Sequence, residues 1–334
     1  MTQAPKIERR PKAFPPPEFP PRKPKLFAKT PPAIFPVVLG LLGLGLALRK
    51  GLAVLGLPGG VVEAVLGALL VFWGFATLAL LAKIARRPGV AAEDLRVLPG
   101  RAGMAASSMS AMLAAAVLVP YAPGLAYWLM ALALAAHALL AGLVIRGLWR
   151  APAEQRVVNP GWHLSFAGFI VAGIPALALG QTGLAQGLLW LTLPIAALIW
   201  GISLAQLIAR IPPAPLRPLL AIHLAPAALF CSVAAGLEQP LLAQSFAAFG
   251  AVILLALIVA ARWVTQAGFS PLWGSFTFPL AAYASGLIGL GGMAGQAGLV
   301  LLVVALGVVP AIGWGVIKLW PTGKLAAKTN AAEA

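Results

Sequence analysis

The stretch Ser270-Pro-Leu-Trp-Gly-Ser-Phe-Thr-Phe-Pro-Leu-Ala-Ala-Tyr-Ala-Ser-Gly286 is apolar enough for a membrane but is interrupted for a lipid-facing helix. Pro279 has no amide hydrogen and frees a carbonyl one turn earlier, so a helix here must kink or open. Hydroxyl groups such as that of Thr277 can satisfy part of the freed backbone. Phe276 and Phe278 stand directly before the kink. Their rings either form the wall or plug of a narrow passage or only fill a helix interface.

The composition is that of a polytopic membrane protein. Of the 334 residues, 61% are hydrophobic and only 10% are charged, and the mean hydropathy is +0.94. Soluble domains carry about 25% charged residues. The net charge of +16 does not indicate nucleic-acid binding, because the basic residues lie at the ends of apolar runs and are not interleaved with aromatic residues.

Apolar segments divide the rest of the chain, and each is long enough to cross most of a hydrocarbon core of about 30 Å at about 1.5 Å per residue. The ten segments are 33–48, 59–84, 101–121, 124–148, 160–179, 183–210, 216–236, 240–266, 271–291 and 295–319. The sequence therefore predicts an all-α integral membrane protein with ten transmembrane helices.

Lys and Arg residues predict the orientation of these helices. Of the 24 Lys and Arg residues, Arg49 and Lys50 alone fall in connections on one side, and all others fall in connections or tails on the opposite side. Positive charge is retained in the cytoplasm, so both termini are expected there, with the protein in a bacterial-type inner membrane. Residues 1–32 form a basic, proline-rich tail expected to be disordered and held against anionic lipid. A channel domain over 33–320 and a cytoplasmic tail over 321–334 complete the expected organisation.

Odd-numbered and even-numbered segments differ in character. The even segments are long and rich in Leu, Ala and Val, whereas the odd segments carry interior proline, glycine or hydroxyl residues. The odd-segment residues predicted to line or kink a pore are Phe35, Pro36, Gly40, Ser107, Pro175, His223, Pro226, Thr277 and Pro279. Broken helices are tolerated at membrane depth where they line a cavity. The pattern predicts five helical hairpins in a pseudo-fivefold ring around a central pore. Close helix packing alone is the alternative reason for the small residues.

Catalytic chemistry has little support in the sequence. There is no H-E-x-x-H, C-x-x-C, P-loop or G-x-S-x-G pattern, and no paired carboxylates lie within a segment. His137 is expected to be a packing residue, His163 to face lipid headgroups, and His223 to be a candidate for the pore. We therefore expect no enzyme activity, no metal and no cofactor. Helix N-termini and a basic mouth would instead favour anions, held weakly.

Three stretches resemble a known family. They are Asn159-Pro-Gly-Trp-His with Ala-Leu-Gly180, Arg217-Pro-Leu-Leu-Ala-Ile-His-Leu-Ala-Pro-Ala-Ala-Leu-Phe-Cys231, and Leu272-Trp-Gly-Ser-Phe-Thr-Phe-Pro-Leu-Ala-Ala282. Together they resemble the fifth, seventh and ninth helices of the tellurite-resistance/dicarboxylate transporter family, in its TehA-like branch, which is related to the plant slow anion channels. The similarity covers about residues 33–320.

This resemblance implies ten helices in five hairpins, a homotrimer with one pore per subunit, and passage of chloride, nitrate, tellurite or C4-dicarboxylates. It also implies that a phenylalanine of the ninth helix blocks the pore. Phe278 matches that residue, and Phe276 is the second choice. The chain departs from a tight dicarboxylate carrier in having no arginine in the middle of a segment.

The leading hypothesis is an anion channel or uniporter gated by Phe278. One alternative is a proton-coupled carrier for C4-dicarboxylate or tellurite, sensitive to substitution of His223. Another is a membrane scaffold that transports nothing and presents the basic tail to a partner.

Overall fold

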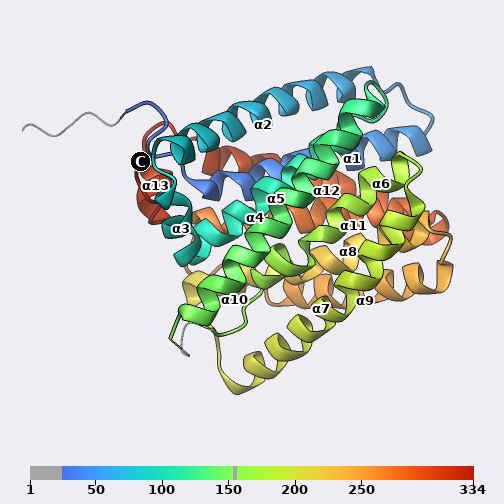
Figure 1. Cartoon of the computed structure of the whole chain (residues 1–334). Coiled ribbons are helices and arrows are strands. Elements are labelled where there is room, and N and C mark those ends of the chain that lie inside the picture. Colours follow the sequence, from blue (N-terminus) through green and yellow to red (C-terminus); the bar gives the residue numbers. More distant parts are fainter. Residues whose placement is uncertain (1–24, 153–155) are drawn as a thin grey trace, which may run out of the picture.

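The computed structural model describes residues 25–152 and 156–334, and within them every regular element is helical and no strand is present. The long helices run roughly side by side (Figure 1). Residues 1–24 of the predicted basic tail lie outside the described residues. The predicted all-α class is confirmed for the described chain.

Eight helices of the described chain are long and apolar enough to cross a membrane. The even-numbered predicted segments correspond to α2 (Gly60–Arg86), α5 (Pro123–Arg150), α7 (Thr182–Ala209), α9 (Pro240–Val259) with α10 (Ala261–Val264), and α12 (Gly292–Ile317). The odd-numbered segments correspond to η1 (Pro32–Ile34) with α1 (Phe35–Val54), α4 (Leu98–Leu118), η3 (His163–Ala167) with η4 (Gly168–Ala172) and α6 (Gly173–Ala178), η5 (Ala214–His223) with α8 (Leu224–Gly236), and η6 (Pro271–Phe276) with α11 (Thr277–Leu290). Two short helices, α3 (Gly89–Arg96) and α13 (Lys324–Lys328), lie between or after the spans.

The fifth and ninth segments are the two that are too irregular to count as single spanning helices. The fifth combines a π-helical turn, a 3-10 stretch and the short α6, and the ninth joins the 3-10 helix η6 to the 14-residue α11. Eight of the ten predicted spans are therefore long helices in the structure, and the other two are the irregular fifth and ninth segments. Whether the broken segments also cross the membrane stays a prediction.

Proline sets the place of each break. Pro36, Pro175, Pro226 and Pro279 all lie in the first three residues of an α-helix, and a 3-10 stretch precedes each of those helices. A proline in the first turn costs no hydrogen bond, because the first amides of a helix have no intrahelical partner. The α-helix can therefore start just before the proline but cannot extend back through it. The break in the ninth segment consequently falls at Phe276–Thr277 and not at Pro279 itself.

Burial separates inner from outer segments. In the spanning windows of the three inner segments that are long enough to count as spans, 72% of the residues are buried, against 11–33% in the five outer helices. Lipid tails are as apolar as Leu and Val, so an outer helix keeps its apolar surface exposed in the isolated chain. We call the odd-numbered segments the inner segments from here on.

Contacts between elements follow the predicted order. Each inner segment packs against the outer helix that follows it, and α1 packs against α4, α4 against η4 and α6, α6 against α8, α8 against α11, and α11 back against α1. The fivefold symmetry itself stays a prediction.

Two segment ends differ from those predicted. The first segment was expected to end at residue 48, but α1 continues to Val54. Arg49 does not stop it, because its guanidinium donates to the Glu63 carboxylate, with 2.7 Å between Nε and Oε1. The regions expected to be tails also pack on the bundle, since Ala28, Thr30 and Leu325 are buried.

Glycine permits the close contact between α1 and α11. A Cβ atom at Gly40 would collide with the Thr277 side chain, whereas one at Gly74 on α2 would meet no atom within 4 Å. We expect Gly40→Ala to destabilise the protein by about 1–3 kcal/mol through overpacking. Gly74→Ala is the matched control and should be neutral or stabilising by up to about 1 kcal/mol. Thermal unfolding in detergent measures both, and equal stability of the two variants would contradict the described packing.

Candidate functional site

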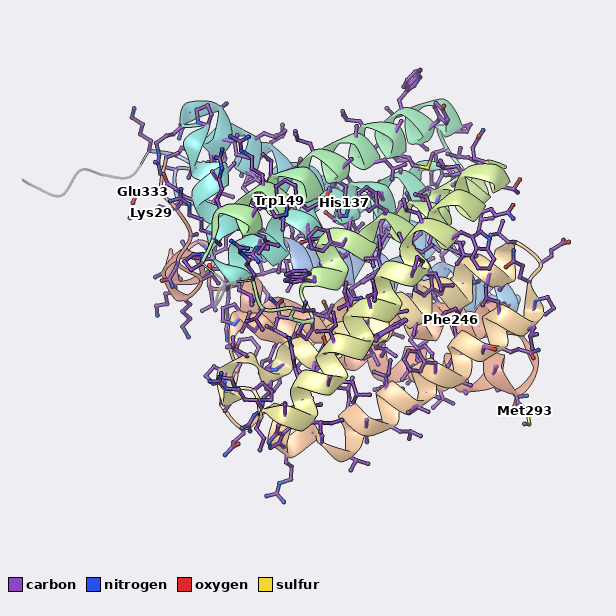
Figure 2. All side chains as sticks on the ribbon, turned by 60° about the horizontal axis from the view of Figure 1, so that its bottom comes forward. Lys29, His137, Trp149, Phe246, Met293 and Glu333 are labelled. Atoms are coloured by element: carbon purple, nitrogen blue, oxygen red, sulfur yellow. The ribbon has the colours of Figure 1, made fainter. Side chains whose placement is uncertain are left out.

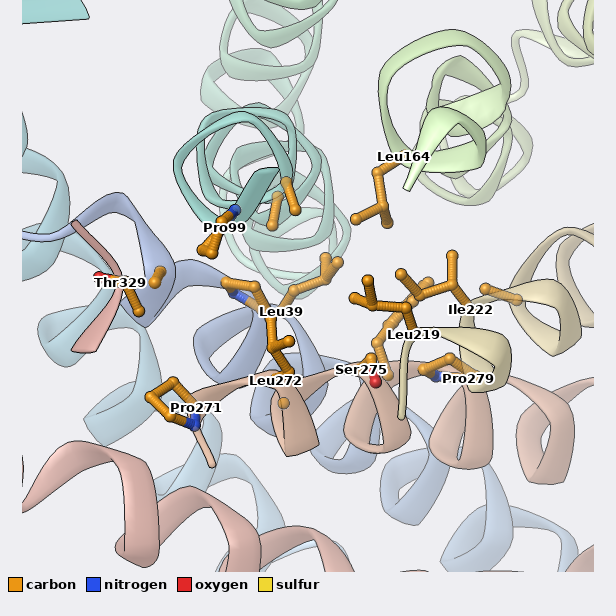
Figure 3. Close-up of a pocket in the computed structure, with 17 residues that line it drawn as sticks. Leu39, Pro99, Leu164, Leu219, Ile222, Pro271, Leu272, Ser275, Pro279 and Thr329 are labelled. Carbon is orange, nitrogen blue, oxygen red and sulfur yellow. The ribbon is translucent and has the colours of Figure 1, made fainter. Parts of the chain in front are cut away.

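A small cavity, which we call the axial cavity, lies where the five inner segments meet (Figure 3). All five inner segments contribute to its wall, and the one other contributor is Thr329, which directly follows α13. The lining residues are Ala33, Pro36, Leu39, Pro99, Ala102, Ala106, Leu164, Leu219, Ile222, Ala225, Pro271, Leu272, Gly274, Ser275, Phe278, Pro279 and Thr329. Its volume is about 40 Å³, which is room for about three water molecules.

The wall of the cavity is almost wholly apolar. Its two polar side chains are Ser275 and Thr329, and both hydroxyl groups already donate to backbone carbonyls, Ser275 to Pro218 and Thr329 to Leu325. No lining residue is charged. The cavity therefore holds no group for acid–base or nucleophilic chemistry, and it offers a bound ion little that would hold it tightly.

Phe278 and Phe276 lie in different environments. Phe278 lines the cavity and is only 4% exposed. Its ring rests against α1 at Gly43, where an added Cβ would lie 3.0 Å from the ring carbon Cδ2. Phe276 is not part of the cavity wall and instead packs edge-on to Trp273, with 5.8 Å between the ring centroids. Of the two rings, Phe278 has the position that a plug of the cavity requires.

Of the other predicted pore residues, two line the cavity and the rest lie outside its wall. Pro36 and Pro279 line the cavity. The residues that do not line it are Phe35, Gly40, Ser107, Pro175, His223, Pro226 and Thr277. Several of these have a clear local role. The Thr277 hydroxyl donates to the carbonyls of Gly274 at 2.7 Å and Pro36 at 3.1 Å, which joins the ninth segment to the first. The Ser107 hydroxyl donates to the Met104 carbonyl of its own helix at 2.7 Å.

The histidines are placed differently from what the sequence suggested. His163 does not face headgroups, because it is 2% exposed and its Nε2 lies 3.0 Å from Nδ1 of His223. That expectation was wrong, since nothing local in the sequence signals a contact between residues 60 positions apart. His223 is next to the lining residue Ile222 but does not itself reach the cavity. His137 is fully buried with its Nδ1 2.8 Å from the Ser108 hydroxyl, as expected of a packing residue.

The C-terminal segment covers the end of the cavity that Thr329 lines. Asp94 of α3 holds this segment, because its Oδ1 accepts the Ala332 amide at 2.8 Å while its Oδ2 lies 2.7 Å from Nζ of Lys83. Lys83 and Asp94 are both buried. A second ion pair joins Lys29 to Glu333 at 3.1 Å, and Figure 2 shows these two residues side by side. We call these contacts of Asp94 and Lys29 with the C-terminal segment the clasp. The sequence did not predict it, because Lys83 and Asp94 lie in a predicted connection, where charged side chains are ordinarily solvated.

Helix N-termini gather around the cavity. The α-helices α1, α8 and α11 begin at Phe35, Leu224 and Thr277, and each contributes a lining residue within its first five positions. The first amides of these helices donate to the preceding 3-10 stretch, that of Phe35 to Pro32, of Leu224 to Ala221 and of Thr277 to Gly274, so partial positive charge at such an end comes from the helix dipole alone. The cavity thus combines an apolar wall with a weakly positive potential.

An uncharged cavity inside a bundle of apolar helices fits a membrane channel or transporter. The sequence profile of the SLAC1 family, described as voltage-dependent anion channel, matches residues 29–319. The chain belongs to this family, whose members are anion channels or transporters, and the family resemblance of the three sequence stretches is confirmed. A search of curated proteins found no match.

The clasp around Asp94 gives a prediction for proteolysis. Asp94→Ala removes the acceptor of the Ala332 amide and leaves the Lys83 ammonium buried without its partner, which costs about 3–5 kcal/mol. We expect the C-terminal segment to detach and trypsin to cleave after Lys324 and Lys328 much faster than in the parent protein. Arg210→Ala is the control, because Arg210 is exposed and directly follows α7, outside the contacts of the C-terminal segment. Equal cleavage of the parent and both variants would show that Asp94 does not hold the segment.

Proposed function

We propose that this protein is an anion channel or uniporter of the inner membrane whose conduction path runs through the axial cavity and is closed by Phe278. One observation carries this proposal: all five inner segments meet at a single small cavity, and Phe278 forms part of its wall. The two ends of such a path would be separated by the ring. Its rotation would open the path.

The chemistry of the cavity supports anions over cations. Cation pathways need carboxylate rings or cages of carbonyl oxygens, and no carboxylate lines this cavity. Three helix N-termini point partial positive charge towards it. Because the wall offers so few polar partners, an entering ion must give up part of its hydration, so ions that dehydrate easily should pass best.

Lys50 places a positive charge on the far side of the Phe278 ring, and this charge also favours anions. Pro36, Gly43 and Lys50 are spaced seven residues apart on α1 and therefore share one helix face. Pro36 lines the cavity, Gly43 rests against the Phe278 ring, and Lys50 follows two turns later, about 10 Å further along the helix. Its ammonium donates to the Ser285 carbonyl at 3.2 Å. The path beyond the ring would thus lead past a cation.

No carboxylate of the described residues neutralises the charge of Lys50. Its neighbour in the chain, Arg49, is paired with Glu63, whereas Lys50 forms no ion pair with any residue in 25–152 or 156–334. An ammonium with one backbone acceptor retains two donors for a passing anion.

The finer parts of the proposal follow from the family and from the charge pattern. We propose ten spans in five hairpins, both termini in the cytoplasm, and a homotrimer with one path per subunit. Opening would couple the Phe278 ring to shifts at the junctions of 3-10 and α-helix near Pro36, Pro175, Pro226 and Pro279. A link to tellurite resistance belongs to the same proposal.

A proton-coupled carrier for C4-dicarboxylate or tellurite is the second candidate function. The contact between His163 and His223 is the observation that favours it, since two imidazoles in contact can exchange a proton. The cavity volume of about 40 Å³ opposes a dicarboxylate in the closed state. A scaffold that transports nothing would require the tail over 1–32, most of which lies outside the described residues.

Anion flux into proteoliposomes tests the gate. We expect Phe278→Ala to raise chloride and nitrate flux about tenfold or more, which corresponds to about 1.4 kcal/mol of barrier. Phe276→Ala is the matched control and should leave flux near that of the parent protein, because that ring packs on Trp273. Saturable, pH-dependent malate uptake that is the same in all three proteins would favour the carrier. Absence of flux in all three would favour the scaffold.

The charge of Lys50 gives a separate expectation. In the Phe278→Ala background, Lys50→Gln should lower chloride flux about tenfold at low ionic strength, and the loss should shrink as added salt screens the charge. Lys50→Arg keeps the charge and should retain most of the flux. If Lys50→Gln conducts as fast as its parent at every salt concentration, the path does not pass the ammonium.

A further inference from the structure

A second and much larger cavity lies between α3, the start of α4 and the last turns of α5. Its volume is about 800 Å³. Four arginines line it, Arg96 from α3, Arg101 from α4, and Arg146 and Arg150 from α5. Three separate helices therefore contribute arginines to the wall of this one cavity, although the residues are up to 54 positions apart in the chain.

The positive charge of this cavity is not neutralised by the described chain. None of the four arginines forms an ion pair with a residue in 25–152 or 156–334. The two carboxylates of α3 are engaged elsewhere, Asp94 with Lys83 and Glu93 with Arg87. The hydrogen bond from Arg87 lowers the pKa of Glu93, so that carboxylate stays ionised and tied to Arg87. Guanidinium groups gathered in this way match the oxygens of a phosphate group.

The rest of the wall is apolar. Leu143, Val144 and Leu148 of α5 line the cavity together with the arginines. Trp149 on the same turn is 78% exposed, and Figure 2 shows its place on the outer face of the bundle. Tryptophan is enriched at the level of lipid headgroups. A ligand that fits this wall has an anionic phosphate at one end and hydrocarbon at the other.

We propose that this cavity binds an anionic phospholipid, with its phosphate held by Arg96, Arg101, Arg146 and Arg150 and an acyl chain along Leu143 and Val144 of α5. Basic pockets between helices at the membrane surface bind lipid headgroups by this combination of charge and apolar contact. The site is separate from the axial cavity and does not depend on the proposed transport function.

The site also adjoins the wall of the axial cavity. Arg101 lines the lipid site, whereas Pro99 and Ala102, its neighbours in the first turn of α4, line the axial cavity. The Arg101 side chain is already fixed by a hydrogen bond from its Nε to the Leu95 carbonyl at 3.1 Å. A lipid phosphate on Arg101 would therefore brace the turn of α4 that forms part of the axial wall.

Native mass spectrometry of the full-length protein, purified in detergent with a mixture of phosphatidylglycerol and phosphatidylcholine, tests this proposal. The expected result is phosphatidylglycerol retained on the parent protein in preference to phosphatidylcholine. Arg146→Gln combined with Arg150→Gln should reduce retention about tenfold or more, because each arginine near a membrane surface contributes to the attraction. Both side chains are exposed, so the variant should fold.

Two controls make the outcome decisive. Arg210→Gln combined with Arg262→Gln removes the same charge at the ends of other helices and should leave retention unchanged. The variant with Arg146→Lys and Arg150→Lys should keep part of the binding, since the charge remains but the planar guanidinium is lost. Equal loss in the Arg210 and Arg262 variant would mean diffuse attraction to the whole basic surface and would overturn the site.

A third measurement distinguishes a phospholipid from a free phosphate as the ligand. Phosphatidylglycerol should raise the unfolding temperature of the parent protein more than that of the Arg146 and Arg150 variant, whereas glycerol phosphate and inorganic phosphate at the same concentration should not. Full protection by inorganic phosphate alone would assign the site to a free anion and overturn the lipid proposal. Equal retention of phosphatidylglycerol and phosphatidylcholine would do the same.

Discussion

The missing amide hydrogen of proline is the constraint on which the rest of this structure depends. Pro36, Pro175, Pro226 and Pro279 each force an α-helix to begin inside the bundle instead of at the membrane surface, with a 3-10 stretch before it. Such breaks are costly in contact with lipid, because freed carbonyls find no partner there. In this chain they occur in four of the five inner segments. The inner helix α4 is continuous, and Pro194 of α7 and Pro310 of α12 lie inside outer helices without ending them.

The same constraint shapes the site. Helices that start inside the bundle place their N-terminal amides beside the axial cavity, where the wall carries no charged side chain. The resulting potential is positive but weak, which suits an ion that must pass and not stay. Phe278, next to Pro279 in the first turn of α11, is carried into the cavity by the geometry of the break.

Much of the arrangement could be predicted from the sequence because proline and hydroxyl residues act locally. The alternation of irregular and long segments and the apolar wall follow from residues close in the chain, whereas the choice of Phe278 before Phe276 came from the family resemblance. The contact between His163 and His223, the hold of Asp94 on Ala332 and the four-arginine cavity were not predicted. Each depends on how distant segments pack, and a charge in a connection has the same sequence signature whether it is solvated, as Glu93 is, or buried like Asp94. The end of α1 was missed for the same reason, since the partner of Arg49 lies on another helix.

The most direct test of the central claim is the accessibility of single cysteines on either side of Phe278. Cys231 is the one native cysteine, so Cys231→Ala supplies the background for Leu272→Cys, at a partly exposed position of the axial cavity wall, and Ser285→Cys beyond the ring. An anionic thiol reagent added on the cytoplasmic side should modify the cysteine at position 272 but not that at 285, and the reagent added on the opposite side should do the reverse. Adding Phe278→Ala should let the reagent reach both positions from either side. Modification of both positions from one side while the ring is present would contradict a path closed at Phe278.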